Sequence, residues 1–226
     1  MDAPARRPAG SSDRLPRGRH GLPREAVADS QRVRILAAMI EVVAAQGYTD
    51  TRVVDVIGIA GVSRKTFYEL FDSKEDCFLA AYDILLGRVL EKAETGFGVQ
   101  PGAPWPVRLE AGLRAVLGHL AAHPEEARFA LVEVLAAGPK ALARRDAALR
   151  QFTGFIETGR SESTIDLPGS TAQTIAGGVS ELLYSEVLHG AAARLPARLP
   201  ELVFLIVLPF LGPERAAAER DRARVA

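Results

Sequence analysis

The stretch GYTDTRVVDVIGIAGVSRKTFYELFDSKE, residues 47–75, decides the fold of the first part of the chain. Apolar residues recur at helical spacing from about Arg52 to Ala60, namely Val53, Val56 and Ile57, before Gly61 breaks the pattern. Ser63 can cap a second short helix, about Arg64 to Phe71, whose inward residues are Phe67, Leu70 and Phe71. The pattern predicts two short helices joined by a tight turn.

Longer helices are expected on both sides of this pair. Upstream, order should begin near Ser30, and an amphipathic helix with Ile35, Met39, Val42, Val43 and Gln46 should end at Gly47. Downstream, Asp72 and Glu75 are spaced as a capping box for a helix that contains Phe78, Ala81, Tyr82, Leu85 and Val89. Together these segments predict a compact, all-helical head.

The two short helices match the helix-turn-helix arrangement, which places its second helix in the DNA major groove. Arg64, Lys65 and Thr66 occupy the first turn of that helix, where side chains reach bases and phosphates. Tyr68 lies on the side opposite the inward residues. Lys74 begins the next helix, where the helix dipole disfavours a cation unless a phosphate lies nearby. Double-stranded DNA is therefore the predicted partner, although an ordinary solvated helix face has the same residue types.

The combined motif resembles the DNA-binding domain of the tetracycline-repressor (TetR) family over roughly a quarter of the chain. The matching residues are Gly47-Tyr48-Thr49-Asp50-Thr51, Val53, Asp55, Val56, Ala60-Gly61-Val62-Ser63, Thr66-Phe67-Tyr68, Phe71 and Ser73-Lys74-Glu75. The resemblance implies an all-helical homodimer, in which a fourth helix joins a three-helix DNA-binding head to a larger ligand-binding and dimerisation domain. It also implies that the positions of Ser63, Thr66 and Tyr68 meet DNA and that Lys74 contacts a phosphate.

Three positions depart from the family pattern, namely Arg52, Ile57 and Leu70. Arg52 stands where Thr or Ser is common, which moves the expected cap of the helix to Thr51 or Asp50 and adds a candidate phosphate contact. The other two departures mainly alter packing. The full set of predicted DNA-binding residues is Thr51, Arg52, Ser63, Arg64, Lys65, Thr66, Tyr68 and Lys74.

The rest of the chain also predicts an all-α fold. Helices are expected near 105–122, 124–137, 140–160, 171–193 and 197–211, and no alternating strand pattern is found. The expected organisation is a flexible basic arm (1–29), the DNA-binding head (30–76), a ligand-binding and dimerisation domain (77–212) and a polar, frayed tail (213–226).

Two groups of apolar residues suggest further sites in the larger domain. Aromatic residues spread over several helices are candidates for a ligand pocket, although plain core packing explains any one of them: Trp105, Phe129, Phe152, Phe155 and Tyr184. The segment from Leu202 to Leu208 has no polar face and must be covered on every side. A second subunit is therefore expected against Ile175, Val179, Leu183, Val187, Val203, Ile206 and Val207.

Charge and cysteine content exclude several classes of protein. Twenty-eight basic residues balance 28 acidic ones, so the chain is not a purely electrostatic binder. The first 34 residues nevertheless contain eight arginines and four acids, and this arm either follows DNA or has no DNA role. The single cysteine, Cys77, excludes an internal disulfide and suits a reducing cytoplasm. A buried structural thiol is the simpler interpretation of it than a redox sensor.

Other chemistry is not expected. The sequence has no nucleophile elbow, phosphate-binding glycine loop or paired-carboxylate pattern, so we predict no enzyme and no cofactor. His119 and His123 are four apart, with Glu126 nearby, but two histidines make an incomplete site and predict no metal. His189 is expected to cap a helix or to lie in the core. No secretory signal is expected, and the ten apolar residues of 202–211 are too few to span a membrane, which requires about twenty.

These observations favour a cytoplasmic, DNA-binding transcriptional regulator, most often a repressor in such proteins. It would bind a pseudo-palindromic operator as a homodimer, with half-sites about 34–36 Å apart or a multiple of that spacing. A small-molecule effector would release it by moving the heads through the fourth helix. The alternatives are a helical ligand-binding protein, with or without enzymatic activity, and a protein-interaction module, neither with operator-specific activity.

Overall fold

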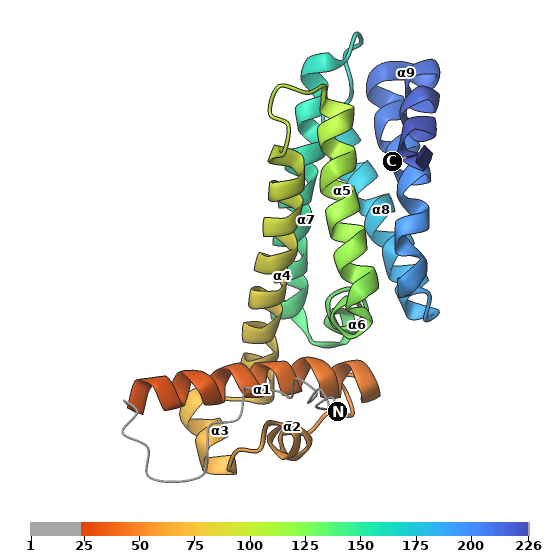
Figure 1. Ribbon diagram of the computed structural model, residues 1–226. Helices are drawn as coiled ribbons and strands as arrows, with labels where there is room; N and C mark the ends of the chain where they lie inside the picture. Colours follow the sequence, from red (N-terminus) through yellow and green to blue (C-terminus); the bar gives the residue numbers. More distant parts are fainter. Residues whose placement is uncertain (1–23, 226) are drawn as a thin grey trace, which may run out of the picture.

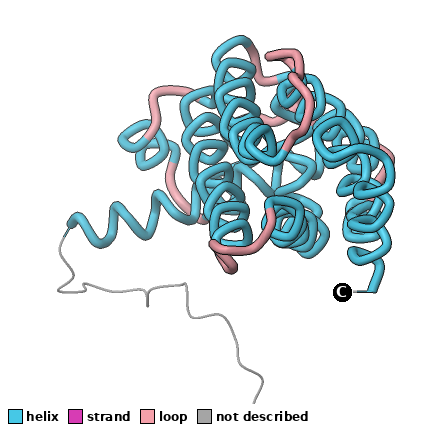
Figure 2. The backbone as a smooth tube through the Cα atoms, turned by 90° about the horizontal axis from the view of Figure 1, so that it is seen from above, coloured by secondary structure: helices cyan, strands magenta, loops and turns pink. Residues whose placement is uncertain are grey.

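The computed structural model describes residues 24–225, and the described chain consists of helices and connecting loops without any strand (Figures 1 and 2). The α-helices are α1 (Arg24–Gln46), α2 (Val53–Ala60), α3 (Arg64–Leu70), α4 (Lys74–Gly98), α5 (Trp105–Ala122), α6 (Pro124–Leu131), α7 (Pro139–Glu157), α8 (Thr171–Leu188) and α9 (Leu199–Val225). Short 3-10 helices follow α6, α7 and α8, namely η1 (Glu133–Ala136), η2 (Thr158–Glu162) and η3 (Ala192–Arg198). The expected all-α fold is confirmed.

Helices α1, α2 and α3 form the head beneath the long bundle in Figure 1. Its core is built from fully buried side chains of all three helices, namely Ile35, Met39, Val43, Val56 and Phe67. Gly61 ends α2 with φ of 63°, a left-handed conformation that favours glycine, and the chain then turns into α3. The Ser63 hydroxyl accepts the Thr66 N–H at 3.0 Å, so the predicted cap of α3 is confirmed.

The start of α4 differs from the expectation by one residue. Ser73, not Asp72, is the N-cap, and its hydroxyl accepts the N–H of Asp76 at 3.0 Å. The Asp76 carboxylate in turn accepts the N–H of Asp72. Asp72 and Ser73 both suit an N-cap, and an acidic residue follows each of them three positions later, so the sequence pattern did not distinguish these two registers.

Helix α4 rises from the head into the body, where α5 and α7 flank it (Figure 1). The axes of α4 and α5 approach closely at Gly96 and Gly112. A Cβ on Gly96 would lie 2.6 Å from the Ala111 carbonyl oxygen, and one on Gly112 would lie 3.1 Å from that of Ala93. The two glycines therefore bring the helices together and set the width of the bundle.

The described N-terminal segment is more regular than expected. Helix α1 begins at Arg24, before the expected start near Ser30. Arg32 donates to the Leu70 carbonyl and Arg34 to the Ala60 carbonyl at 2.9 Å. These two arginines therefore satisfy the C-terminal ends of α3 and α2 and add cations where the helix dipoles favour them. The rest of the predicted arm, residues 1–23, lies outside the described residues.

The expected frayed tail is wrong for the described residues up to Val225. After a kink at Gly212, where φ is 78°, the helix continues and buries Ala216, Glu219 and Ala223. Arg222 pairs with Glu219 at 2.8 Å and with the buried Glu110 of α5 at 2.6 Å. These ion pairs hold the segment against α5. The polar composition of the tail alone could not predict them.

Helix α9 contains the most apolar segment of the described chain. Together with η3 it is long and apolar enough to cross a membrane, with a mean hydropathy of 1.7 in its most apolar window, 39% of which is buried. Core helices pass the same test, and here Leu202, Val203, Ile206, Val207 and Phe210 pack inside the body. Helix α9 is therefore a core helix in this structure.

Candidate DNA-reading surface and ligand cavity

The first turns of α3 present a polar, basic surface. Arg64, Lys65 and Tyr68 are exposed, with 86% of the Lys65 side chain and 47% of Tyr68 accessible. The Arg64 guanidinium lies 5.7 Å from the centre of the Tyr68 ring, and Lys65 is 3.7 Å from Glu69. Such weak surface contacts leave both cations free to meet an anion. Ser63 and Thr66 bond to each other through their hydroxyls at 2.9 Å beside this surface.

Thr51 and Arg52 occupy different environments. Thr51 is only 2% exposed, and its hydroxyl donates to the Gly47 carbonyl at 2.7 Å. The prediction that Thr51 caps α2 is therefore wrong, since Arg52 is the N-cap, and the burial of Thr51 does not favour its predicted contact with DNA. Arg52 is the N-cap residue and is exposed, but its guanidinium binds Asp55 at 3.0 Å. Hydrogen bonds from Arg52 hold the pKa of the Asp55 carboxyl down at about 2.

The Lys74 side chain points inward, and its ammonium group already has hydrogen-bond partners within the head. Its ammonium donates to the carbonyls of Tyr48 at 2.8 Å and Thr51 at 2.9 Å, and it lies 4.2 Å from the centre of the Tyr48 ring. Burial lowers the pKa of this lysine from its ordinary value. Lys74 therefore ties the start of α4 to the turn that precedes α2, a role that the sequence did not indicate.

Glu133 of η1 connects the body to the same turn. Its carboxylate accepts the backbone N–H of Tyr48 at 2.9 Å and pairs with Arg128 of α6 at 3.0 Å. Glu133 is buried, so the bond is shielded from water. Sequence reasoning missed this residue because its partner lies 85 positions away.

An apolar cavity of about 150 Å³ lies within the body, between α4, α5, α7 and α8. Its lining includes Tyr82, Leu86, Val89, Phe97, Leu113, Val116, Leu117, Leu149, Phe152, Phe155, Val179, Leu183 and Ile206. Arg145 is the one charged residue among the lining side chains, and its guanidinium donates to the Ser180 hydroxyl at 3.3 Å. The cavity thus offers a hydrocarbon environment with one cationic corner.

Only Phe152 and Phe155 of the five aromatic residues predicted for a pocket line this cavity. Trp105 instead packs on Phe210, with 4.9 Å between ring centres, and its indole N–H donates to the Phe155 carbonyl. Phe129 packs on Phe78 at 4.4 Å. Tyr184 is also absent from the lining. For Trp105 and Phe129 the plain core interpretation was the better one, and the aliphatic residues of α4 and α5 supply most of the cavity wall.

The residues predicted for a dimer interface are mostly inside the single chain. Leu183, Val187, Val203, Ile206 and Val207 are all buried by the chain's own helices. Val179 is half-buried beside the cavity, and Ile175 is half-buried against the core. The prediction is wrong for the five buried residues, because it chose the most apolar positions rather than those left exposed.

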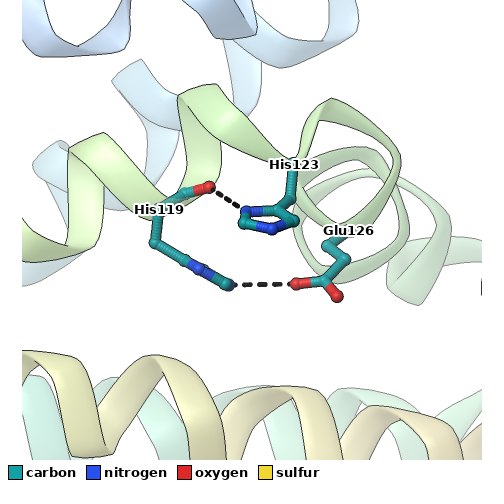
Figure 3. A group of neighbouring side chains, drawn as sticks. All are labelled: His119, His123 and Glu126. Atoms are coloured by element: carbon teal, nitrogen blue, oxygen red, sulfur yellow. Dashed lines mark hydrogen bonds and ion pairs between the residues drawn. The ribbon is translucent and has the colours of Figure 1, made fainter. Parts of the chain in front are cut away.

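Two further predicted features have clear surroundings. Cys77 is fully buried, and burial raises the pKa of its thiol to about 12. The structure brings His119, His123 and Glu126 together at the corner between α5 and α6 (Figure 3). The expectation of no metal rested on a missing third ligand, and Glu126 supplies a third candidate. His189 follows α8 and bonds through Nδ1 to the Ser185 carbonyl at 2.7 Å, so it lies at a helix end as expected.

Comparisons with known proteins agree with the geometry of the head. A family profile described as "Bacterial regulatory proteins, tetR family" matches residues 35–81. The HTH-type transcriptional regulator EthR of Mycolicibacterium smegmatis is 29% identical over 130 residues. The match covers 58% of this chain and 58% of that relative, so little more than half of the relative's length is represented.

Solved structures share the fold over most of the body as well. The fatty acid degradation regulator FadR from Bacillus halodurans superposes with a TM-score of 0.69 at 21% identity, covering 78% of this chain and 94% of that one. FadR from Bacillus subtilis, solved in complex with stearoyl-CoA, gives 0.67 at 21% identity, covering 77% and 97%. A gamma-butyrolactone receptor (ArpA-like protein) gives 0.64 at 20% identity, covering 88% and 98%. At such identities these likenesses concern the fold alone.

Proposed function

Because its N-terminal domain places the chain in the tetR family of bacterial regulatory proteins, we propose that the protein is a cytoplasmic transcriptional repressor. It binds a pseudo-palindromic operator as a homodimer, and an apolar small molecule releases it. The observation that carries this proposal is the exposed basic surface of α3 on a helix-turn-helix.

The α3 surface is suited to reading the major groove. Arg64 and Lys65 lie in its first turn, where exposed backbone amides also attract phosphate. The exposed Tyr68 hydroxyl lies one turn further along the helix. Lys65 is the best candidate for a base contact because its only pairing, with Glu69, is long and exposed. Arg52 is a candidate for a phosphate contact, for which its guanidinium would give up its ion pair with Asp55.

The dimer interface is proposed on the exposed side of α8 and α9. Leu188 and Leu205 are 41% and 46% exposed, and Phe204 and Leu208 are half-buried. Gly177 and Gly178 of α8 have open space where a Cβ would lie, which lets a second helix approach closely. A two-fold axis through these helices places the same surface on both subunits.

The effector is proposed to be a long-chain acyl compound with an anionic group. The cavity wall is hydrocarbon apart from Arg145 and Ser180, and a carboxylate or phosphate would pair with the Arg145 guanidinium. The acyl-CoA bound by the FadR of Bacillus subtilis belongs to this chemical class. A cavity of 150 Å³ holds only a benzene-sized molecule, so an acyl chain must push the lining helices apart.

The contacts provide a route from the cavity to the head. Ala130 and Leu131 of α6 line the cavity, and Glu133 follows them closely in the chain and bonds to Tyr48 at the turn before α2. Displacement of α6 by a ligand would shift this turn, which Lys74 also ties to α4. Such coupling between two sites is typically about 1–3 kcal/mol.

A gel-shift assay with DNA from upstream of the protein's own coding region tests the proposal. We expect a salt-sensitive complex that resists competitor DNA and is weakened by stearoyl-CoA or stearate. Lys65→Ala should weaken binding by about 1–3 kcal/mol at the operator position it reads. Arg150→Ala, which removes an exposed cation from α7, is the matched control and should bind normally. No specific complex under any ligand condition would favour the ligand-binding or protein-interaction alternatives.

A further inference from the structure

We propose that His119, His123 and Glu126 form a binding site for a divalent transition metal of the zinc type. The three residues lie at the corner between α5 and α6, outside the apolar cavity. His119 belongs to the last turn of α5, His123 joins the two helices, and Glu126 lies in the first turn of α6.

The ligand atoms are already gathered. One ligand atom from each residue lies within 4.8 Å of the others, and Figure 3 shows the two imidazoles and the carboxylate grouped at this corner. The Nε2 atom of His119 is 3.0 Å from Oε2 of Glu126, so a metal would take the place of the proton shared there. Small side-chain rotations would then bring the three atoms to the separations of ligands around a single ion.

The orientation of the ligands is also fixed by neighbouring groups. Nδ1 of His123 lies 2.9 Å from the His119 carbonyl oxygen, a contact that makes Nδ1 the donor and leaves Nε2 to bind a metal. The second oxygen of Glu126, Oε1, forms an ion pair with the Arg88 guanidinium of α4 at 3.0 Å, which leaves Oε2 for the ion. Metal-binding histidines and carboxylates in proteins are held in place by neighbouring polar and charged groups in this way.

The donor set and the surrounding charge select the ion. Two imidazoles and one carboxylate are a three-ligand set that zinc uses with a water in the fourth position. Imidazole donors favour zinc over magnesium or calcium, which prefer oxygen. The positive charge of Arg88 disfavours a bound cation. A hollow beside the site is also lined by Glu41 and Glu125, and their negative charges offset that of Arg88.

The proposed metal site lies close to the junction between the head and the body. The hollow beside it is walled by α1 and α4 as well as by the α5–α6 corner, so it lies where the head meets the body. An ion bound to Oε2 of Glu126 would hold the carboxylate on Arg88 and so fasten α6 to α4. A metal ion bound at this site would therefore affect the junction between head and body independently of a ligand in the apolar cavity.

The test is zinc binding to the purified full-length protein after treatment with a chelator and desalting. Titration against a chromophoric competing chelator should show one tight equivalent per chain. His123→Gln should abolish that equivalent, and because His123 is exposed this variant should fold normally. His189→Gln is the matched control, since it removes an exposed histidine at a different helix end, and it should bind zinc like the wild type.

A second measurement identifies the ligands. Cobalt-loaded wild-type protein should show the strong visible absorption of four-coordinate Co²⁺, and Glu126→Gln should shift and weaken it. The proposal is overturned if the wild type binds no tight equivalent, or if His123→Gln and Glu126→Gln bind the metal as the wild type does. Neither readout involves DNA, so failure here is distinct from failure of the proposed repressor function.

Discussion

Lys65 and Lys74 lie only nine positions apart, yet their ammonium groups have different surroundings. Lys65 is solvated and has one long contact with Glu69, whereas Lys74 donates to two backbone carbonyls and covers the Tyr48 ring. A solvated lysine is free to exchange its contact for a base or phosphate. A lysine that is already bonded can add a phosphate only through its remaining N–H group.

Lys74→Ala is therefore expected to lower the free energy of unfolding by about 1–3 kcal/mol, because hydrogen bonds that involve a charged group are worth more than neutral ones. Urea unfolding would measure the change, with Lys65→Ala as the control, expected within about 0.5 kcal/mol of the wild type. If Lys74 also meets a phosphate, its variant should flatten the salt dependence of operator binding by about one unit. Unchanged stability would show that the two carbonyl bonds do not hold the turn.

Cys77 should behave as a structural residue. Burial raises the pKa of its thiol to about 12, so almost no thiolate is present near neutral pH. We expect a thiol-specific reagent to label the folded protein at pH 8 hardly at all and to label one thiol per chain in denaturant. Rapid labelling of the folded protein would instead support the redox-sensor interpretation.

At the scale of elements, helical periodicity predicted the all-α fold and the helix-turn-helix. The cap at Ser63 could be predicted because a cap is a local interaction between residues three apart. The helical tail and the contact of Glu133 with Tyr48 could not, because both depend on partners distant in sequence. The dimer residues were mistaken for the same reason, since apolar character alone does not tell which side of α9 its own chain covers.

The contact between α4 and α5 gives a prediction with an internal control. Gly96→Ala would place a Cβ 2.6 Å from the Ala111 carbonyl oxygen and force the helices apart, at a cost of about 1–3 kcal/mol. Gly87→Ala lies in the same helix with nothing within 4 Å of the new Cβ, and it should stabilise α4 by about 0.5–1 kcal/mol. Thermal unfolding of both variants would reveal the opposite signs, and a shared sign would contradict the close approach.

At the scale of the whole molecule, the proposed function requires the head, the cavity and the exposed α8–α9 surface to act together. Two heads can read two half-sites only if a second copy fixes their separation, and the described chain has one head. The proposed effector can shift the equilibrium between the two arrangements of the heads only by as much as its affinity differs between them. In the proposed dimer, the exposed leucines of α8 and α9 would therefore be required for operator binding although they would never touch DNA.

Leu205→Glu tests this dependence. The side chain is 46% exposed, so the change should leave the fold of the single chain intact, but it would place a charge in an apolar interface next to its symmetry mate. We expect light scattering to report a monomer and the gel shift to lose the operator complex. Leu142→Glu on α7, where the leucine is 38% exposed, is the matched control and should remain a dimer that binds DNA. A Leu205→Glu protein that stays dimeric would move the interface away from α9, whereas a monomer that still binds the full operator tightly would show that each head acts alone.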